Sequence, residues 1–139
     1  MDAEELIERL ELHPHPEGGH YRRVWQHDEH GEDGRPLASA ITYLLPHGVT
    51  SRWHRVDGVE MWEHELGGPL EVSIVSDAGG VVRHVIGIDA AGLRRVVVPA
   101  GAWQRARSMG DFSLVTCTVT PGFVWDGFEL APEGWEPGA

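Results

Sequence analysis

The chain has 139 residues, of which 41% are apolar, so it can bury the core of one domain. It carries 22 acidic and 11 basic residues, and this formal charge of −11 disfavours nucleic acid as a partner. No apolar run approaches the roughly 18 residues that span a bilayer. The acidic start "MDAEELIERL" lacks the basic and apolar regions of a signal peptide. We therefore expect a soluble cytoplasmic protein with no membrane partner.

The N-terminal segment predicts a short helix over residues 2–12. Asp2 and Glu5 have the spacing of a capping box. Three apolar residues share one face of this helix: Leu6, Ile7 and Leu10. Because Pro14 disfavours helical backbone for the residue before it, the helix should end near His13.

The rest of the chain consists of short apolar or alternating runs, separated by turns rich in Gly, Pro and Asp. The expected strands lie at residues 20–27, 37–45, 50–56, 59–66, 70–76, 81–88, 93–98, 102–108, 112–119 and 123–130. Many short strands at regular intervals indicate an antiparallel sandwich or barrel. The expected fold class is therefore all-β with one short N-terminal helix. In the tail, Trp135 is the residue expected to contact the body.

Several residues outside the central motif receive structural rather than functional interpretations. Gly18 and Gly19 predict a tight turn. Arg22 and Arg23 follow on opposite faces of a strand, so at most one of them should face the pocket. Cys117, the only cysteine, lies in an apolar run and is expected to be a buried core residue. Five histidines near strand ends or in loops are assigned to the surface: His13, His15, His27, His30 and His47.

The strand at residues 59–66 places polar side chains on both of its faces. Alternation puts Glu60, Trp62, His64 and Leu66 on one face, and Met61, Glu63 and Glu65 on the other. Two carboxylates on the core side would be costly, so the face with Glu63 and Glu65 is expected to meet solvent. The inward Glu60 then needs hydrogen-bonding or charged partners. Such a strand forms either a functional site or an energetically costly core.

The turn at Asp57-Gly58 leaves two strand registers open. A two-residue hairpin loop pairs His54 with Met61, whereas a loop of residues 57–59 pairs His54 with Trp62. The second register is the predicted one, because it gathers the polar side chains on one face. The residues that it turns inward are Arg52, His54, Glu60, Trp62 and His64.

The same stretch resembles the first motif of the cupin superfamily, with Gly48, His54, Glu60 and Gly67 at the motif's spacing. The second motif is matched by "PAGAWQ", residues 99–104. Further pieces, among them "HPHPEGGHYRR", "SRWHRVDGVEMW" and "LVTCTVTPGF", resemble the small cupin-5 (DUF985-like) group of unknown function. Together these matches run over residues 13–131.

The resemblance implies a double-stranded β-helix, also called a jelly roll or cupin barrel. Residues 1–139 would form a single cupin domain, with the helix in 1–13, the barrel in 19–130 and a tail in 131–139. The family expectation is a homodimer that binds a small-molecule ligand inside the barrel.

The resemblance breaks at the metal ligands. Metal cupins use two histidines and a glutamate from the first motif and a histidine from the second. Here Val56 replaces the second histidine and Gln104 replaces the last one. No metal or other cofactor is therefore favoured. If a divalent metal is bound, its ligands would be His54, Glu60 and Gln104.

His54 and Glu60 are the candidate catalytic couple, because an imidazole oriented by a carboxylate can move protons near neutral pH. Tyr43, in "ITYLL", is the candidate third catalytic group through its phenolic proton. The candidate ligand-binding residues are Arg52, Trp62, His64 and Gln104.

These residues leave several functions open. One is a metal-independent isomerase or epimerase acting on a sugar-like or keto-acid-like ligand, by analogy with jelly-roll sugar-nucleotide epimerases. A second is a small-molecule binding module with no chemistry. A third is a metal-dependent cupin enzyme with a divergent ligand set, and a fourth is a structural dimer with a vestigial pocket. Whether the protein is an enzyme therefore stays open at this point.

Overall fold

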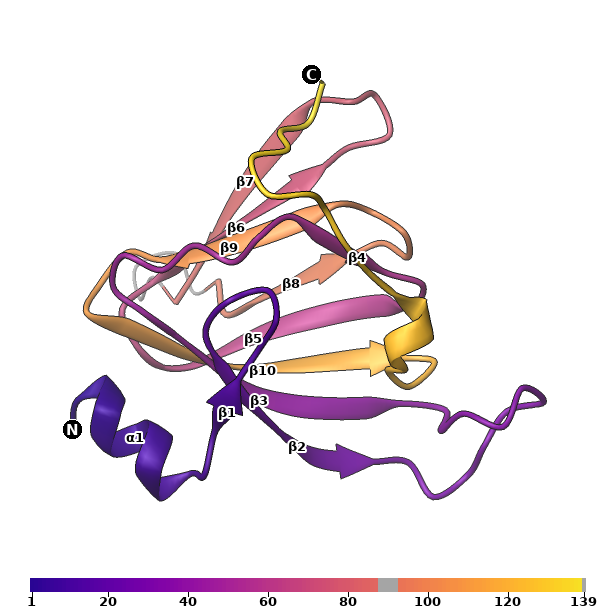
Figure 1. Ribbon diagram of the computed structural model, residues 1–139, viewed down its shortest axis with the longest axis horizontal. Coiled ribbons are helices and arrows are strands. Elements are labelled where there is room, and N and C mark those ends of the chain that lie inside the picture. The colour runs from indigo at the N-terminus through magenta and orange to yellow at the C-terminus, as the bar shows by residue number, and fades with distance from the viewer. Residues whose placement is uncertain (88–92, 139) are drawn as a thin grey trace.

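The computed structural model describes residues 1–87 and 93–138 (Figure 1). Residue 88, where one expected strand ends, lies outside the described residues. The helical elements are α1 (Ala3–Arg9) and the 3₁₀ helix η1 (Trp125–Gly127). The strands are β1 (His13–Pro14), β2 (His20–Gln26), β3 (Ser39–Pro46), β4 (His54–Val56), β5 (Val59–Gly67), β6 (Leu70–Val75), β7 (Val81–Ile86), β8 (Arg95–Val98), β9 (Gln104–Ser108), β10 (Phe112–Thr120) and β11 (Phe128–Leu130).

The strands form two antiparallel sheets that pack face to face (Figure 1). One sheet has the order β1-β2-β3-β10-β5-β8 and the other has the order β11-β4-β9-β6-β7. The main core lies between them, built from inward side chains such as Tyr43, Trp62 and Val72. This arrangement is a jelly roll, so the predicted fold class is confirmed.

The N-terminal helix is shorter than predicted but begins where expected. The Asp2 carboxylate accepts a hydrogen bond of 2.9 Å from the Glu5 amide, as an N-cap should. The helix ends at Arg9, and Glu11 adopts a positive φ of 55°. Leu6 then packs on Leu44 of β3, in a second core cluster that covers the outer face of the six-stranded sheet.

The predicted hairpin between the strands around Asp57 is wrong. β4 pairs with β9 and β11, whereas β5 pairs with β8 and β10, so the two strands belong to different sheets. The turn passes close to the end of β10, since a Cβ at Gly58 would lie 2.9 Å from the carbonyl oxygen of Thr120. His54 and Glu60 are nonetheless both buried, since each strand turns one face into the space between the sheets.

The alternation predicted for β5 holds over most of the strand. Glu60, Trp62 and His64 are buried as expected, but Leu66 is 48% exposed. The register with β10 shifts between His64 and Leu66, which leaves Glu65 without a cross-strand partner. This β-bulge slips the alternation by one residue and turns Leu66 outward.

The C-terminal tail is held against the five-stranded sheet by its tryptophan, as predicted. The ring of Trp135 lies 4.8 Å from that of Trp103 and 6.1 Å from that of Trp53. In the described part of the chain, no helix has the length and apolarity needed to cross a membrane.

Candidate functional site

A cavity of about 330 Å³ lies between the two sheets, near the loop before β2 and the segment before β11. Its deepest polar groups are buried: Glu17, His54, Glu60 and Cys117. Its walls include Tyr21, Ile41, Val56, Val119, Phe123 and Phe128. Its exposed rim includes His13, Arg22, Arg23 and Trp125. The cavity therefore has an ionisable floor, a mainly hydrocarbon wall and a basic rim.

Glu60 points into this cavity from β5 and is oriented by a chain of hydrogen bonds. The indole N–H of Trp62 donates to Gln104 Oε1 at 2.8 Å, and Gln104 Nε2 donates to Glu60 Oε1 at 2.7 Å. Since an indole nitrogen can only donate, the orientation of the Gln104 amide is fixed. Burial raises the pKa of Glu60 to about 7, although the hydrogen bonds from Gln104 and Cys117 act in the opposite direction.

His54 enters the same cavity from β4, in the opposite sheet. Its Nδ1 lies 2.8 Å from the carbonyl oxygen of Arg52, which can only accept, so the proton of the neutral ring sits on Nδ1. Nε2 therefore presents a lone pair, and it lies 3.4 Å from Glu17 Oε2. Burial lowers the pKa of His54 to about 4, against a small opposing effect of the Arg52 carbonyl.

Glu17 is the main site residue that sequence reasoning missed. It lies in the turn before β2, is 6% exposed and accepts a hydrogen bond of 3.2 Å from the Tyr43 hydroxyl. Burial and the nearby Glu60 raise the pKa of Glu17 well above its ordinary value. Because His54 Nε2 offers a lone pair to this carboxyl, a proton on Glu17 can be shared between the two groups, in addition to the proton on His54 Nδ1. The only sequence signal was its place in the "HPHPEGGHYRR" match.

The turn that carries Glu17 also buries His15, so its assignment to the surface is wrong. The ring is 9% exposed, its Nδ1 accepts a hydrogen bond of 3.1 Å from the Glu17 amide, and its pKa is lowered to about 4, mainly by burial. The predicted Gly18-Gly19 turn is present. Gly19 has a φ of +74°, and a Cβ there would lie 2.7 Å from the carbonyl oxygen of Leu44. Only glycine fits at this position.

Three of the predicted site residues lie behind the cavity surface rather than on it. Tyr43 is 1% exposed, and its hydroxyl contacts Glu17 and the carbonyl oxygen of Gly18. Trp62 is a core residue that reaches the site through Gln104. Gln104 itself is fully buried and orients Glu60. These residues can position the carboxyl groups of Glu17 and Glu60 but do not line the space that a ligand would occupy.

Two other predicted residues lie away from the cavity. Arg52 is not inward: it is exposed, and its guanidinium donates to the carbonyl oxygen of Ala131. The predicted inward orientation depended on the β4–β5 pairing that the fold does not form. His64 is buried, but its Nε2 contacts the carbonyl oxygen of Gly68 at 2.9 Å and its ring packs on Gly87. Neither residue lines the cavity.

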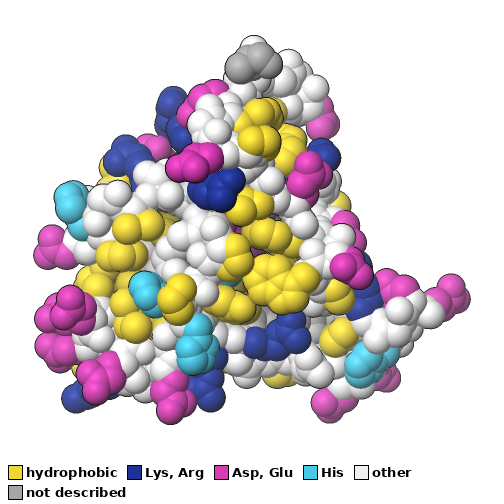
Figure 2. All heavy atoms as spheres, viewed as in Figure 1, with side chains coloured by type: hydrophobic (Ala, Val, Ile, Leu, Met, Phe, Trp, Pro, Cys, Tyr) yellow, Lys and Arg dark blue, Asp and Glu magenta, His cyan; other side chains and the backbone are white. Residues whose placement is uncertain are grey.

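The expectation that at most one of Arg22 and Arg23 faces the pocket is also wrong, because both side chains line the cavity at its rim. β1 pairs only with the first two residues of β2, so the sheet has a free edge from Arg22 onward. Long side chains on either face of an edge strand can reach the same opening. On the face shown in Figure 2, basic side chains lie next to a central hydrophobic group, and acidic side chains lie mostly around the periphery.

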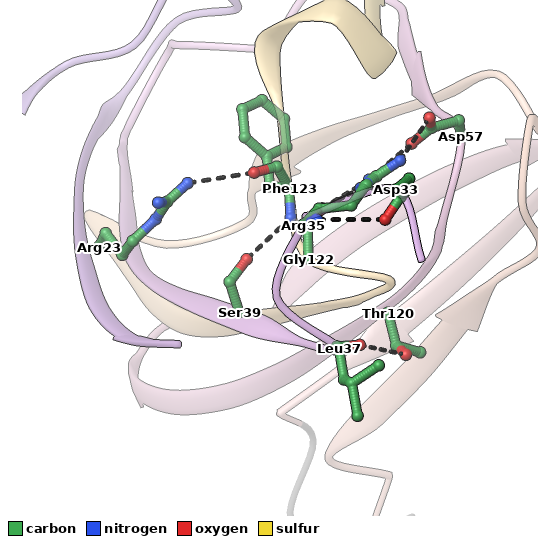
Figure 3. Close-up of polar contacts among 9 residues, drawn as sticks. All are labelled: Arg23, Asp33, Arg35, Leu37, Ser39, Asp57, Thr120, Gly122 and Phe123. Carbon is green, nitrogen blue, oxygen red and sulfur yellow. Dashed lines mark hydrogen bonds and ion pairs between the residues drawn. The ribbon is translucent and has the colours of Figure 1, made fainter. Parts of the chain in front are cut away.

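Residues 123–128, called here the aromatic segment, close one side of the cavity. Figure 3 shows how polar contacts hold its first residues. The Phe123 amide donates to Ser39 Oγ at 2.9 Å, and Arg23 donates to the Phe123 carbonyl oxygen at 3.3 Å. Arg35 Nε donates to the Gly122 carbonyl oxygen at 2.9 Å and also binds Asp57. The segment is thereby fastened to β2 and β3 and, through Arg35, to the turn that follows β4.

Two face-to-face antiparallel sheets with an interior ionisable cavity define a small cupin-fold protein. The chain belongs to the Cupin superfamily (DUF985) family, whose sequence model matches residues 4–131. A protein from Shewanella oneidensis is 38% identical, with a TM-score of 0.88, over 94% of this chain and 85% of that one. A hypothetical protein from Leishmania major is 29% identical, with a TM-score of 0.84, over 94% of this chain and 88% of that one.

More distant solved structures share the fold of this chain, and their similarity carries no information on its function. Oxalate decarboxylase from Bacillus subtilis is 16% identical, with a TM-score of 0.67, over 87% of this chain and 30% of that enzyme. At this identity the match shows a shared fold only. No curated protein matches the sequence.

The metal site of metal-binding cupins does not fit the residues present. Among the residues that the structure describes, no group of three or more His, Cys, Asp or Glu side chains is placed to hold a metal ion. Gln104, the third conditional ligand, turns its oxygen to Trp62 and its N–H to Glu60. Val56 offers only hydrocarbon where the motif has a histidine. His54 and Glu60 alone fall short of the usual three protein ligands.

Proposed function

We propose that this protein is a metal-independent enzyme of the isomerase or epimerase type that moves a proton on a small polar ligand bound in the cavity. The observation that carries the proposal is the pairing of two different ionisable units on one cavity floor. Burial raises the pKa of Glu60 to about 7, and the Glu17 carboxyl lies 3.4 Å from His54 Nε2 in the same cavity. Perturbed ionisable groups in a cleft mark candidate catalytic sites.

Each unit has a role in such a reaction. Near neutral pH a large fraction of Glu60 is ionised, so its carboxylate can remove a proton from a carbon next to a carbonyl group. The Glu17–His54 pair can give its proton to the carbonyl oxygen as the enol forms. In a ligand that carries a hydroxyl on that carbon, Glu60 then returns the proton to the neighbouring carbon of the enediol. The pair takes the proton of the other enediol hydroxyl, so the carbonyl group moves by one carbon and the isomerisation is complete. A general base in this position would supply on the order of 10²–10⁴-fold in rate.

The order of roles differs from the one expected from the sequence. The sequence predicted that a His54–Glu60 couple moves the proton, with the phenolic proton of Tyr43 as a third catalytic group. Burial makes His54 a weak base, with a pKa of about 4, and Tyr43 does not line the cavity. Glu60 is better matched to a base working at neutral pH, and Tyr43 is better placed to hold Glu17.

The test is exchange of solvent deuterium into small ketones, keto acids and keto-sugars, followed by NMR. We expect exchange above the protein-free rate, and we expect Glu60→Gln to reduce it by about 10²-fold or more. Glu65→Gln is the matched control, because Glu65 is exposed on the same strand and bonds Thr116. No exchange with any compound would contradict the enzyme proposal and favour a non-catalytic binding module.

A further inference from the structure

The cavity walls favour a ligand with an apolar planar body. Its volume of about 330 Å³ is near the lower end of the roughly 300–1,000 Å³ typical of ligand pockets, which suits one ring with short substituents. The aromatic segment presents three interlocked rings. The Trp125 ring lies 4.9 Å from that of Phe123 and 5.5 Å from that of Phe128, both edge to face. A sugar ring needs hydrogen-bonding groups around its perimeter, and these three rings supply mainly hydrocarbon.

The rim carries a positive charge that no carboxylate of the described residues neutralises. Arg22 is paired with Glu11 at 2.9 Å. Arg23, by contrast, contacts only neutral oxygens, those of Gln26 at 3.4 Å and Phe123 at 3.3 Å. Among the described residues no acidic side chain lies within ion-pair distance of Arg23. The Arg23 guanidinium is therefore available to an anion at the rim.

The polar groups of the cavity are separated by depth. Arg23 is exposed at the rim, whereas Glu17 and Glu60 are each only 6% exposed at the floor. The deep carboxyls disfavour an anionic group at the floor, because like charges repel and burial is costly. An anionic group therefore belongs at the rim, and a neutral carbonyl group belongs at the floor.

We propose that the cavity binds a small aromatic carboxylate, with the carboxylate on Arg23, the ring against the aromatic segment and a carbonyl group at the floor. Only the placement of the carbonyl group rests on the proposed function. The carboxylate and ring contacts stand on the rim and walls alone.

Three simple probes separate these contacts. 4-Acetylbenzoate has the carboxylate, the ring and the carbonyl group, acetophenone lacks the carboxylate, and 4-oxopentanoate lacks the ring. Binding to the wild-type protein is measured by isothermal titration calorimetry at low salt. We expect 4-acetylbenzoate to bind about tenfold or more tightly than either partial probe, as one charge-assisted contact or one ring-stacking contact would give.

Arg23→Gln should abolish the preference for 4-acetylbenzoate over acetophenone while leaving acetophenone affinity unchanged. Because Arg23 also holds Phe123, a collapsed aromatic segment would instead weaken both probes, and Arg23→Lys should then restore the preference. Arg95→Gln is the control. Arg95 lies on β8, pairs with Glu63 of β5 and does not line the cavity.

Three results would overturn the proposal: no binding of 4-acetylbenzoate at millimolar concentration, equal binding of the acid and acetophenone to the wild-type protein, or an unchanged preference in Arg23→Gln. These outcomes are independent of catalysis. A protein that exchanges deuterium into keto-sugars but shows no preference for the acid keeps the proposed function and loses this ligand class. Tight binding of 4-acetylbenzoate without any deuterium exchange would support this ligand class and contradict the proposed function.

Discussion

Glu60 is a buried carboxyl whose ionisation should be visible in the stability of the protein. Its pKa is raised from 4.5 to about 7, so below pH 4.5 it is neutral in both the folded and the unfolded chain. Between these values the unfolded chain loses the proton first, which lowers the free energy of unfolding as pH rises. Above the folded pKa the loss is complete, on the order of 3 kcal/mol.

We therefore predict that Glu60→Gln matches the wild-type protein in stability near pH 4 and exceeds it by a few kcal/mol at pH 8. Urea unfolding of both proteins across this range gives the difference. His15 and His54, whose folded pKa values are lowered, cost stability as pH falls below their unfolded values. They contribute equally to both proteins and drop out of the comparison. A stability difference that is flat with pH would show that Glu60 does not titrate in this range.

At the scale of secondary-structure elements, Arg35 links the aromatic segment to the turn between β4 and β5. Arg35 is 11% exposed at its side chain, forms two hydrogen bonds with Asp57 and donates to the Gly122 carbonyl oxygen (Figure 3). It thereby joins the turn between β4 and β5 to the segment that closes the cavity. These hydrogen bonds also hold the pKa of Asp57 below its ordinary value.

Arg35→Met keeps the aliphatic stem, leaves the Gly122 carbonyl oxygen without its donor and should cost about 2–3 kcal/mol. Arg55→Met is the matched control, because Arg55 pairs with Glu129 at an exposed site and should contribute at most ~1 kcal/mol. Chemical denaturation measures the cost, and hydrogen exchange of residues 122–128 reports on the segment. Equal losses of stability in Arg35→Met and Arg55→Met would mean that the hydrogen bonds of Arg35 do not hold the aromatic segment.

At the scale of the whole molecule, the outer face of the six-stranded sheet ends in exposed apolar side chains. Val97 on β8 is 54% exposed and Val59 on β5 is 39% exposed. β8 pairs with β5 and is the last strand of its sheet, so no strand of the described residues pairs with its other edge. Open edges and apolar patches invite association. We propose that two copies of the chain meet on this face.

We predict a homodimer by sedimentation equilibrium, and a monomer for Val97→Glu, because an unpaired carboxylate at the contact would have to lose its water. Val82→Glu is the control, since Val82 is 45% exposed on β7 in the other sheet. A wild-type monomer, or a dimer that Val97→Glu leaves intact, would contradict the proposal.

The local pattern of residues determined much of this molecule. Alternation identified the buried face of β5 through Glu60 and His64, because side chains in a strand point to opposite sides whatever the strand pairs with. The Asp2 cap, the Gly18-Gly19 turn and the short strands followed from backbone preferences in the same way. The motif spacing pointed to His54 and Glu60, and both line one cavity.

Only the tertiary structure decided which side chains meet across the sheets. The sequence at Asp57 predicts a hairpin, but the chain there crosses from one sheet to the other. Long-range packing determines which strands pair. Glu17 lies in a loop whose burial depends on β3 and β4, so nothing periodic marks it. The rim arginines and the aromatic segment come from distant parts of the chain. Alternation within a strand therefore predicts most of its inward side chains, whereas the fold determines which of them share a cavity and therefore what chemistry they can perform.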